Sequence, residues 1–550
     1  MSKPNGFLHV VQALHGDCLM FEYDQKDGSG FMLIDGGPSR SYQRNRQDYR
    51  STANLFQLLT DLSGTRPSSL PSLEFIDTVV VTHDDADHKD GIADLFKFLL
   101  QDTNCPNAIW QTGLNAMTLT PKKLPIKNVW YNSQLNLIKQ YIFEQNPPTA
   151  PLTTLGWLNA SGAPEAGWFD NLLTSYNNSF PPPDRMRFNQ EFVKMLEPAN
   201  TQQSSKKGRK EVKLEPTVSL VAAGSMAKTQ IVRKGRFAFK ILGPSYAKEL
   251  MNEKLITELV ESSGREATRT PDALGRSNMR GATQYTTTKA SPTLDSSVKN
   301  RSSIAFVATD VGDGVGSGAK LLMLGDAAIA SQIDAGEYNI MKIAHHGSGN
   351  NSFLNSYTDA MKTAEIKVNG RALRNAFGFF YRVKARKYVI SASPYEGSPN
   401  PHFTTILGIY LANVENYIQR SKDHKPVDVY LTNPFPGKAL HNFGLFLNDP
   451  EKLQYTDSNN DVVQALATNI SDKTLKLLGA ANYDKYMRIW LLRSDAAYGS
   501  IPIYEERSSH AAWLPFALTD LQAAYAGLTG PPPAAGPAPK RARYGHPSKT

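Results

Sequence analysis

The chain has 550 residues, 40% of them hydrophobic, which is enough to bury a large core. Its net charge is +9 and its pI is near 9.1. No apolar stretch approaches the roughly 18 residues that span a bilayer, and the first residues form no apolar signal region. The two cysteines have no CxxC partner, which argues against a disulfide framework or a zinc ribbon. We therefore expect a soluble, cytoplasmic protein with no membrane partner.

The first strong signal is an apolar run that ends in a cluster of polar side chains. Residues 75–81 are rich in β-branched residues and predict a buried strand. The loop that follows holds His83, Asp84, Asp85, Asp87 and His88. Burying so many acids is costly unless a cation compensates them, so this loop is a candidate metal site. The alternative is a solvated acidic turn that contains histidine.

Histidines return only at position 345, although the chain has 11 of them. Three later strands are predicted, and each precedes a candidate ligand: residues 321–324 before Asp326, residues 340–344 before His345 and His346, and residues 387–393 before His402. Carboxylates and imidazoles at corresponding ends of successive strands form a ligand set for two transition-metal ions.

These motifs resemble the metallo-β-lactamase fold, and within it the ComEC-like competence hydrolase-domain branch. The matching segments lie in the family's order: His15–Met20, Leu33–Gly37, Thr82–His88, Gly243–Ser245, Asn300–Ile304, Leu324–Ala327, His345–Ser348 and His402. The resemblance implies an α/β (α+β) fold, a four-layer αββα sandwich with a dinuclear metal centre at one edge. It also implies a phosphodiesterase or other hydrolase activity.

Two departures from the family pattern concern the metals. Asp85 replaces the second histidine of the usual His-x-His-x-Asp-His motif. An added carboxylate favours manganese, iron or magnesium-like ions over zinc, although zinc also accepts carboxylates. No histidine lies between the first motif and Asp326, so His345 or His346 must replace the usual ligand. We expect two divalent ions, Mn or Zn, with Fe as a further candidate.

The resemblance also implies a role for each residue. One ion is assigned to His83, Asp85 and one of His345 and His346; the other is assigned to Asp87, His88 and His402; Asp326 bridges them. Asp35 is expected to orient the ligand loops through hydrogen bonds, or else to be a simple turn residue. The histidine of the pair that does not ligate is the candidate proton donor to the leaving group. Asp87, His345 and His346 are the predicted catalytic residues.

The predicted domain covers residues 1–450, with insertions at about 110–213 and 261–299. We expect a helix over residues 129–143 in the first insertion. A glycine-rich stretch at residues 310–318 is expected to connect a hairpin, because it lacks a phosphate-loop ending. A small helical C-terminal segment follows at residues 451–529, with a helix over residues 461–492, and residues 530–550 form a basic tail expected to be disordered.

Basic runs at residues 206–210, 382–387 and 540–543 favour a polyanionic substrate, or else are merely solvated. Trp110, Trp130, Tyr131, Trp157 and Trp168 could stack bases or belong to the core. The leading hypothesis is a metal-dependent phosphodiesterase or nuclease acting on nucleic acid or a nucleotide. The alternatives are a hydrolase of small esters, thioesters or lactams, a di-iron electron-transfer protein, for which no flavin unit is evident, and a non-catalytic metal clamp in a partner-binding protein.

Overall fold

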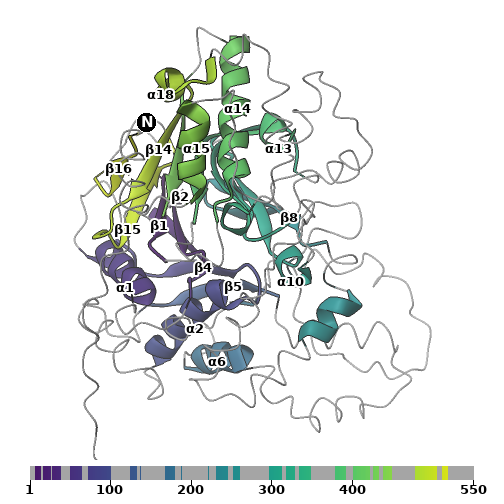
Figure 1. The fold of residues 1–550 in the computed structure, drawn as a ribbon. Coiled ribbons are helices and arrows are strands. Elements are labelled where there is room, and N and C mark those ends of the chain that lie inside the picture. Colours follow the sequence, from purple (N-terminus) through teal and green to yellow (C-terminus); the bar gives the residue numbers. More distant parts are fainter. Residues whose placement is uncertain are drawn as a thin grey trace, which may run out of the picture.

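The computed structural model contains two sheets and the helices that pack against them. It describes residues 6–13, 16–25, 28–38, 50–64, 72–100, 124–132, 137, 168–179, 187–188, 221, 231–245, 250, 252–259, 297–312, 318–328, 333–348, 378–391, 400–420, 425–432, 438–448, 477–504 and 511–517. These ranges form a mixed α/β structure of the α+β type with two large sheets (Figure 1). No helix within them is long and apolar enough to cross a membrane.

The first sheet has seven strands and is built mainly from the N-terminal part of the chain. In spatial order they are β15 (Tyr498–Pro502), β1 (Gly6–Val11), β2 (Leu19–Gln25), β3 (Gly28–Ile34), β4 (Ile76–Val81), β5 (Ile126–Tyr131) and β6 (Arg187–Phe188). Strands β3 to β6 run parallel, so the carboxyl ends of β3 and β4 lie side by side.

The second sheet has nine strands. They are β16 (Trp513–Pro515), β14 (Met487–Leu492), β13 (Val427–Leu431), β12 (Val383–Ile390), β11 (Gly336–Lys342), β10 (Lys320–Met323), β9 (Ala305–Asp310), β8 (Phe237–Gly243) and β7 (Ile231–Lys234). Strands β10 to β14 are parallel, and the others are antiparallel to their neighbours. The carboxyl ends of β10, β11 and β12 therefore share one edge.

The sheets share one apolar cluster, which includes Phe21, Trp130, Phe306 and Tyr430. The seven-stranded sheet forms a second cluster with α1 (Arg50–Ser63), α2 (Ala86–Leu100) and α6 (Trp168–Asn178). The nine-stranded sheet forms a third with α13 (Gly378–Arg382), α14 (Phe403–Arg420), α15 (Lys438–Asn448) and α18 (Tyr483–Tyr486). Short helices among the described residues also include α10 (Val298–Arg301), residues 253–259, and the 3-10 turns His345–Gly347 and Ala480–Asn482. Figure 1 shows α1, α2 and α6 gathered apart from α13, α14 and α15.

The strands predicted to carry ligands are confirmed. Strand β4 is buried along its whole length, as expected for β-branched residues between two parallel neighbours. Strands β10, β11 and β12 cover most of the other three predicted runs. The glycine-rich stretch at residues 310–318 connects the antiparallel strands β9 and β10, so the hairpin prediction is also correct.

The helix predicted over residues 129–143 is wrong in its first part. Residues 126–131 form β5, which pairs in parallel with β4. Trp130 is fully buried in the cluster between the sheets and Tyr131 packs on the helix side, so neither is free to stack a base. Burial on both faces outweighs the weak local helix signal. Part of the expected first insertion thus belongs to the sheet.

The C-terminal segment also differs from its prediction. Residues 487–492 of the expected helix form β14, which pairs with β13, and β15 pairs with β1. Residues 451–529 therefore contribute strands to both sheets. Apolar side chains of these strands, such as Ile489 and Ile501, are buried in the core. The tail at 530–550 and most of the second insertion lie outside the described residues.

One basic run is part of the fold. Residues 382–387 end α13 and begin β12, and Lys387 is buried with its Nζ donating to the carbonyl of Pro502. This lysine therefore serves the packing of the sheets and is not a surface cation. The runs at residues 206–210 and 540–543 lie outside the described residues.

Three glycines join the loop after β3 to helix α2. The Gly91 amide donates to the Gly37 carbonyl, and the Gly36 amide donates to the His88 carbonyl, at 2.9 and 2.8 Å. A Cβ at Gly91 would lie 1.9 Å from the Gly36 oxygen. This close backbone contact holds Asp35 beside the first turn of α2.

We predict that Gly91→Ala destabilises the protein, although alanine favours a helix by about 1 kcal/mol relative to glycine. The clash with backbone leaves no flexible side chain to move, so we expect a loss of several kcal/mol in the free energy of unfolding, measured by urea denaturation. Gly479→Ala is the control, because its added Cβ would meet nothing within 4 Å. Equal stabilities of the two variants would contradict this account.

Candidate metal centre

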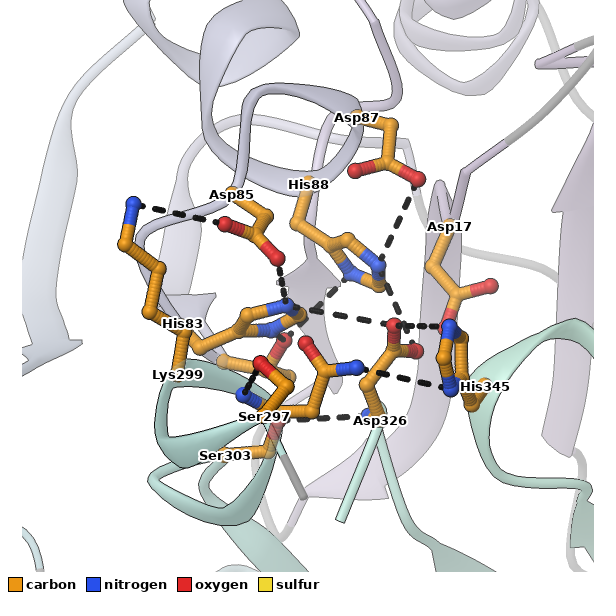
Figure 2. Close-up of polar contacts among 12 residues, drawn as sticks. Asp17, His83, Asp85, Asp87, His88, Ser297, Lys299, Ser303, Asp326 and His345 are labelled. Carbon is orange, nitrogen blue, oxygen red and sulfur yellow. Dashed lines mark hydrogen bonds and ion pairs between the residues drawn. The ribbon is translucent and has the colours of Figure 1, made fainter. Parts of the chain in front are cut away.

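The predicted ligands of the first motif lie where β4 meets α2. His83 and Asp85 are in the short connection, whereas Asp87 and His88 belong to the first turn of α2, not to the loop that the sequence suggested. The amides of His88 and residue 89 donate to the Asp85 carbonyl, which starts the helix. Helix geometry thereby turns Asp87 and His88 toward the end of the neighbouring sheet (Figure 2).

The remaining ligands come from the nine-stranded sheet. Asp326 follows β10, and His345 and His346 follow β11. His345, His346 and Gly347 all have positive φ, of 47°, 53° and 84°. Alternation along a strand would send adjacent imidazoles to opposite faces, and this left-handed turn brings both back to one centre. The turn begins at His345, two residues before Gly347.

Three groups of side chains lie close enough to hold an ion. They are His83, His88 and Asp326; Asp87, His88 and His346; and Asp17, Asp35 and His88, with ligand atoms within 4.8 Å of one another in each group. His83, Asp87, His88, Asp326 and His346 are thus brought together as predicted. The Asp326 carboxylate lies between the histidines: Oδ1 is 3.4 Å from His88 Nε2, and Oδ2 is 3.8 Å from Nε2 of both His345 and His346.

Asp35 orients two of the histidines. Its Oδ2 lies 2.8 Å from His88 Nδ1 and accepts the Thr82 hydroxyl at 2.7 Å, while Oδ1 accepts the Thr82 amide at 2.8 Å. Because the hydroxyl proton goes to Asp35, Thr82 Oγ1 is free to accept from His83 Nδ1, 3.1 Å away. Asp35 is therefore more than a turn residue: its contacts hold a proton on both Nδ1 atoms and direct both Nε2 atoms at the centre.

The buried Nε2 atoms of His83 and His88 make no hydrogen bond within the part of the chain that the structure describes. Both point toward the Asp326 carboxylate (Figure 2). A buried ring nitrogen without a hydrogen-bond partner is costly unless another ligand, such as a metal ion, occupies the space before it. Imidazole nitrogens and carboxylate oxygens in this arrangement suit Mn²⁺, Fe²⁺ or Zn²⁺.

One side of the centre is more exposed. The side chains of Asp85 and His345 are 34% and 28% exposed, against 4% for Asp326. Asp85 Oδ2 lies 3.4 Å from His83 Nε2, and its Oδ1 lies 3.6 Å from the Lys299 amine. Asp85 belongs to none of the three compact groups. To bind a metal ion as predicted, its carboxylate would have to turn away from Lys299.

The charged groups stabilise one another electrostatically. Burial alone would lower the pKa of His346, but Asp326, Asp17 and Asp87 outweigh it and raise that pKa to about 10. The pKa of His88 is likewise raised, against burial, chiefly by Asp326 and Asp35. Burial would raise the pKa of Asp326, yet the three surrounding imidazoles hold it well below its usual range. The centre is thus built to balance cationic and anionic charge.

His402 does not complete the second site as predicted. Its backbone amide donates to the Gly347 carbonyl at 2.9 Å, just before α14. Its side chain is in none of the three groups found among the described residues, and His346 stands with Asp87 and His88 instead. Because of the left-handed turn at residues 345–347, His346 lies beside Asp87 and His88, where the sequence predicted His402.

Several contributing residues were missed from the sequence: Asp17, Thr82, Lys299, Asn300 and Lys342. Asp17 and Asn300 lie inside quoted motifs, but nothing local showed which ligand they touch. Lys342 stands in an otherwise apolar strand end, and a lysine in such a place signals a buried partner.

No protein-family profile matches the chain, and no curated protein matches it in sequence. The site is therefore interpreted from its own geometry.

Asp35→Asn is predicted to weaken both the fold and metal binding. One amide oxygen replaces two carboxylate oxygens that serve three donors, so at least one buried donor loses its partner, at a cost of about 1–3 kcal/mol in the free energy of unfolding. Mn²⁺ affinity should fall about 10–100-fold. Urea denaturation and calorimetric titration measure the two effects. Asp334→Asn, an exposed acid paired with Lys240, is the control and should show neither; an unchanged Mn²⁺ affinity in Asp35→Asn would refute the orienting role.

Proposed function

We propose that this protein is a metal-dependent phosphodiesterase of the metallo-β-lactamase type, with nucleic acid as its substrate. The observation that supports it most is the convergence of Asp87, His88, Asp326 and His346 from two sheets. The buried Nε2 atoms of His83 and His88 are aimed at the same space. Two sheets that share an apolar cluster, each covered by helices, are what a four-layer αββα sandwich requires.

The residues divide into two ligand sets. Asp87, His88 and His346 would hold one ion, His83 and Asp85 the other, and Asp326 would bridge them. When bound, such ions supply hydroxide at neutral pH and offset the charge on the attacking and leaving oxygens of a phosphodiester.

His345 and His346 are suited to different tasks. The Asn300 amide, in its present orientation, donates toward His345 Nδ1 at 3.4 Å, which leaves the proton of a neutral ring on Nε2. The His346 ring has carboxylates beside both nitrogens, Asp17 at Nδ1 and Asp87 at Nε2. His346 is buried and His345 is partly exposed. We therefore assign His346 as a ligand and His345 as the group that protonates the leaving oxygen.

A polyanionic substrate agrees with the charge of the protein. The net charge of +9 attracts nucleic acid, and Lys299 places an amine, 23% exposed, beside Asp85. Lys299 can meet a phosphate oxygen of the substrate when Asp85 turns to a metal.

The first test is degradation of linear and circular, single- and double-stranded DNA and RNA in Mn²⁺, Zn²⁺ or Mg²⁺. We expect cleavage by the parent and by the control Asp334→Asn, and a loss of more than about 100-fold in Asp87→Asn, since losing a ligand exceeds the 10–100-fold cost of losing its support. Binding should weaken with salt.

Other outcomes reject the proposal in favour of a specific alternative. Equal cleavage by all variants indicates a contaminating nuclease. Metal-dependent hydrolysis of small esters without salt-sensitive DNA binding indicates a small-molecule hydrolase. A metal-induced rise in unfolding temperature without turnover of any substrate indicates a structural clamp.

A second prediction separates the two histidines. His345→Ala should keep its metals but cleave DNA about 10²–10⁴-fold more slowly, the usual contribution of a general acid. With bis(p-nitrophenyl) phosphate the loss should nearly vanish, because a nitrophenolate leaves without a proton. His346→Ala should instead lose metal, measured by elemental analysis. Equal losses on both substrates in His345→Ala would contradict the assignment.

A further inference from the structure

Asp17 and Lys342 form a buried ion pair behind His346. Asp17 lies in the turn between β1 and β2, and Lys342 is the last residue of β11; each side chain is only 1% exposed. The Lys342 amine is 2.7 Å from Asp17 Oδ2 and also donates to the Ile343 carbonyl at 2.8 Å. One oxygen of Asp17 is thus occupied by a cation that is itself fixed.

The other oxygen of Asp17 faces His346. Oδ1 lies 3.6 Å from His346 Nδ1, and neither of these buried atoms has a hydrogen-bond partner among the described residues. Two facing groups that each lack a partner gain by closing to hydrogen-bond distance, which takes a shift of a few tenths of an ångström. A proton on Nδ1 satisfies both.

We propose that Asp17, anchored by Lys342, is a positioning residue that accepts the Nδ1 proton of His346 and so presents the Nε2 lone pair of this ring to a metal ion. The inference rests on the metal centre of the proposed function. It assigns Asp17 the part that Asp35 plays for His88, where the carboxylate to Nδ1 distance is 2.8 Å.

The surroundings of Asp17 suit this part. A Cβ at Gly16 would lie 2.0 Å from the Asp87 carbonyl oxygen, so the turn that carries Asp17 packs directly on the first turn of α2. Asp17 is thereby held at a set place relative to both Asp87 and His346. Lys342 cancels its charge, so Asp17 adds an acceptor without adding to the negative charge of the centre. Figure 2 shows Asp17 beside the ligand side chains.

The competing interpretation is purely structural: the ion pair would only join the β1–β2 turn to the end of β11. Replacing both partners by apolar residues of similar size separates the two roles, because it removes the acceptor without leaving a buried charge unpaired. An amide at position 17 restores the acceptor alone.

The test compares Asp17→Leu/Lys342→Met with Asp17→Asn/Lys342→Met in full-length, metal-free protein titrated with Mn²⁺ by calorimetry. The unfolding temperature of the metal-free variants monitors the fold. We expect the Leu variant to bind its tightest Mn²⁺ about 10–100-fold more weakly than the parent, the usual cost of removing a supporting hydrogen bond. The Asn variant should recover most of that loss, since its oxygen still accepts from Nδ1. The matched control is Arg493→Met/Asp495→Leu, an exposed pair, which should bind like the parent.

Unchanged affinity in the Leu variant, or equal weakening in both variants at matched unfolding temperatures, would overturn the proposal. A parent that binds no divalent ion would overturn it together with the proposed metal centre. A parent that binds Mn²⁺ but cleaves no phosphodiester would reject the proposed function and leave this inference standing.

Discussion

The structure depends on placing several carboxylates and imidazoles together in a buried space where two sheets meet. Such charges are stable only when each is balanced, because burial opposes ionisation of Asp87, Asp326 and His88 alike. Parallel strands solve the geometric part of this problem. The ends of β3 and β4 bring most of the carboxylates, whereas the end of β11 brings two imidazoles, so acids from one sheet meet histidines from the other.

The two nitrogens of each histidine ring face different surroundings. Nδ1 of His83, His88 and His346 faces the interior toward Thr82, Asp35 and Asp17, whereas Nε2 faces the shared space. The acceptors behind His83 and His88 hold a proton on Nδ1 of each ring, so less rearrangement would accompany the binding of an ion at Nε2. His345 differs because an amide donor stands at its Nδ1. Identical side chains at adjacent positions therefore have different polar neighbours, Asn300 at His345 and two carboxylates at His346.

The sequence predicted much of this site and less of the fold. The ligand-bearing strands were recognisable because β-branched runs ending in His and Asp are a local signal, as at β4. Strand β5 was missed because its state is decided by pairing with β4 and by burial on both faces, neither of which is encoded nearby. The choice between His346 and His402, and the partners Asp17 and Lys342, depended in the same way on contacts between distant segments.

The backbone is strained at the candidate metal centre, where contacts between distant segments determine the structure. Asp35, His345 and His346 are the non-glycine residues with positive φ in the described ranges, and each belongs to the centre. Such a conformation costs of order 1 kcal/mol or more for each residue. It persists because the hydrogen bonds of Asp35 and the docking of Gly347 against Pro401 hold the chain in place. Left to their own preferences, these three residues would adopt negative φ. Their strained conformations at one site indicate that the fold is less stable there because the side chains must point at a common centre.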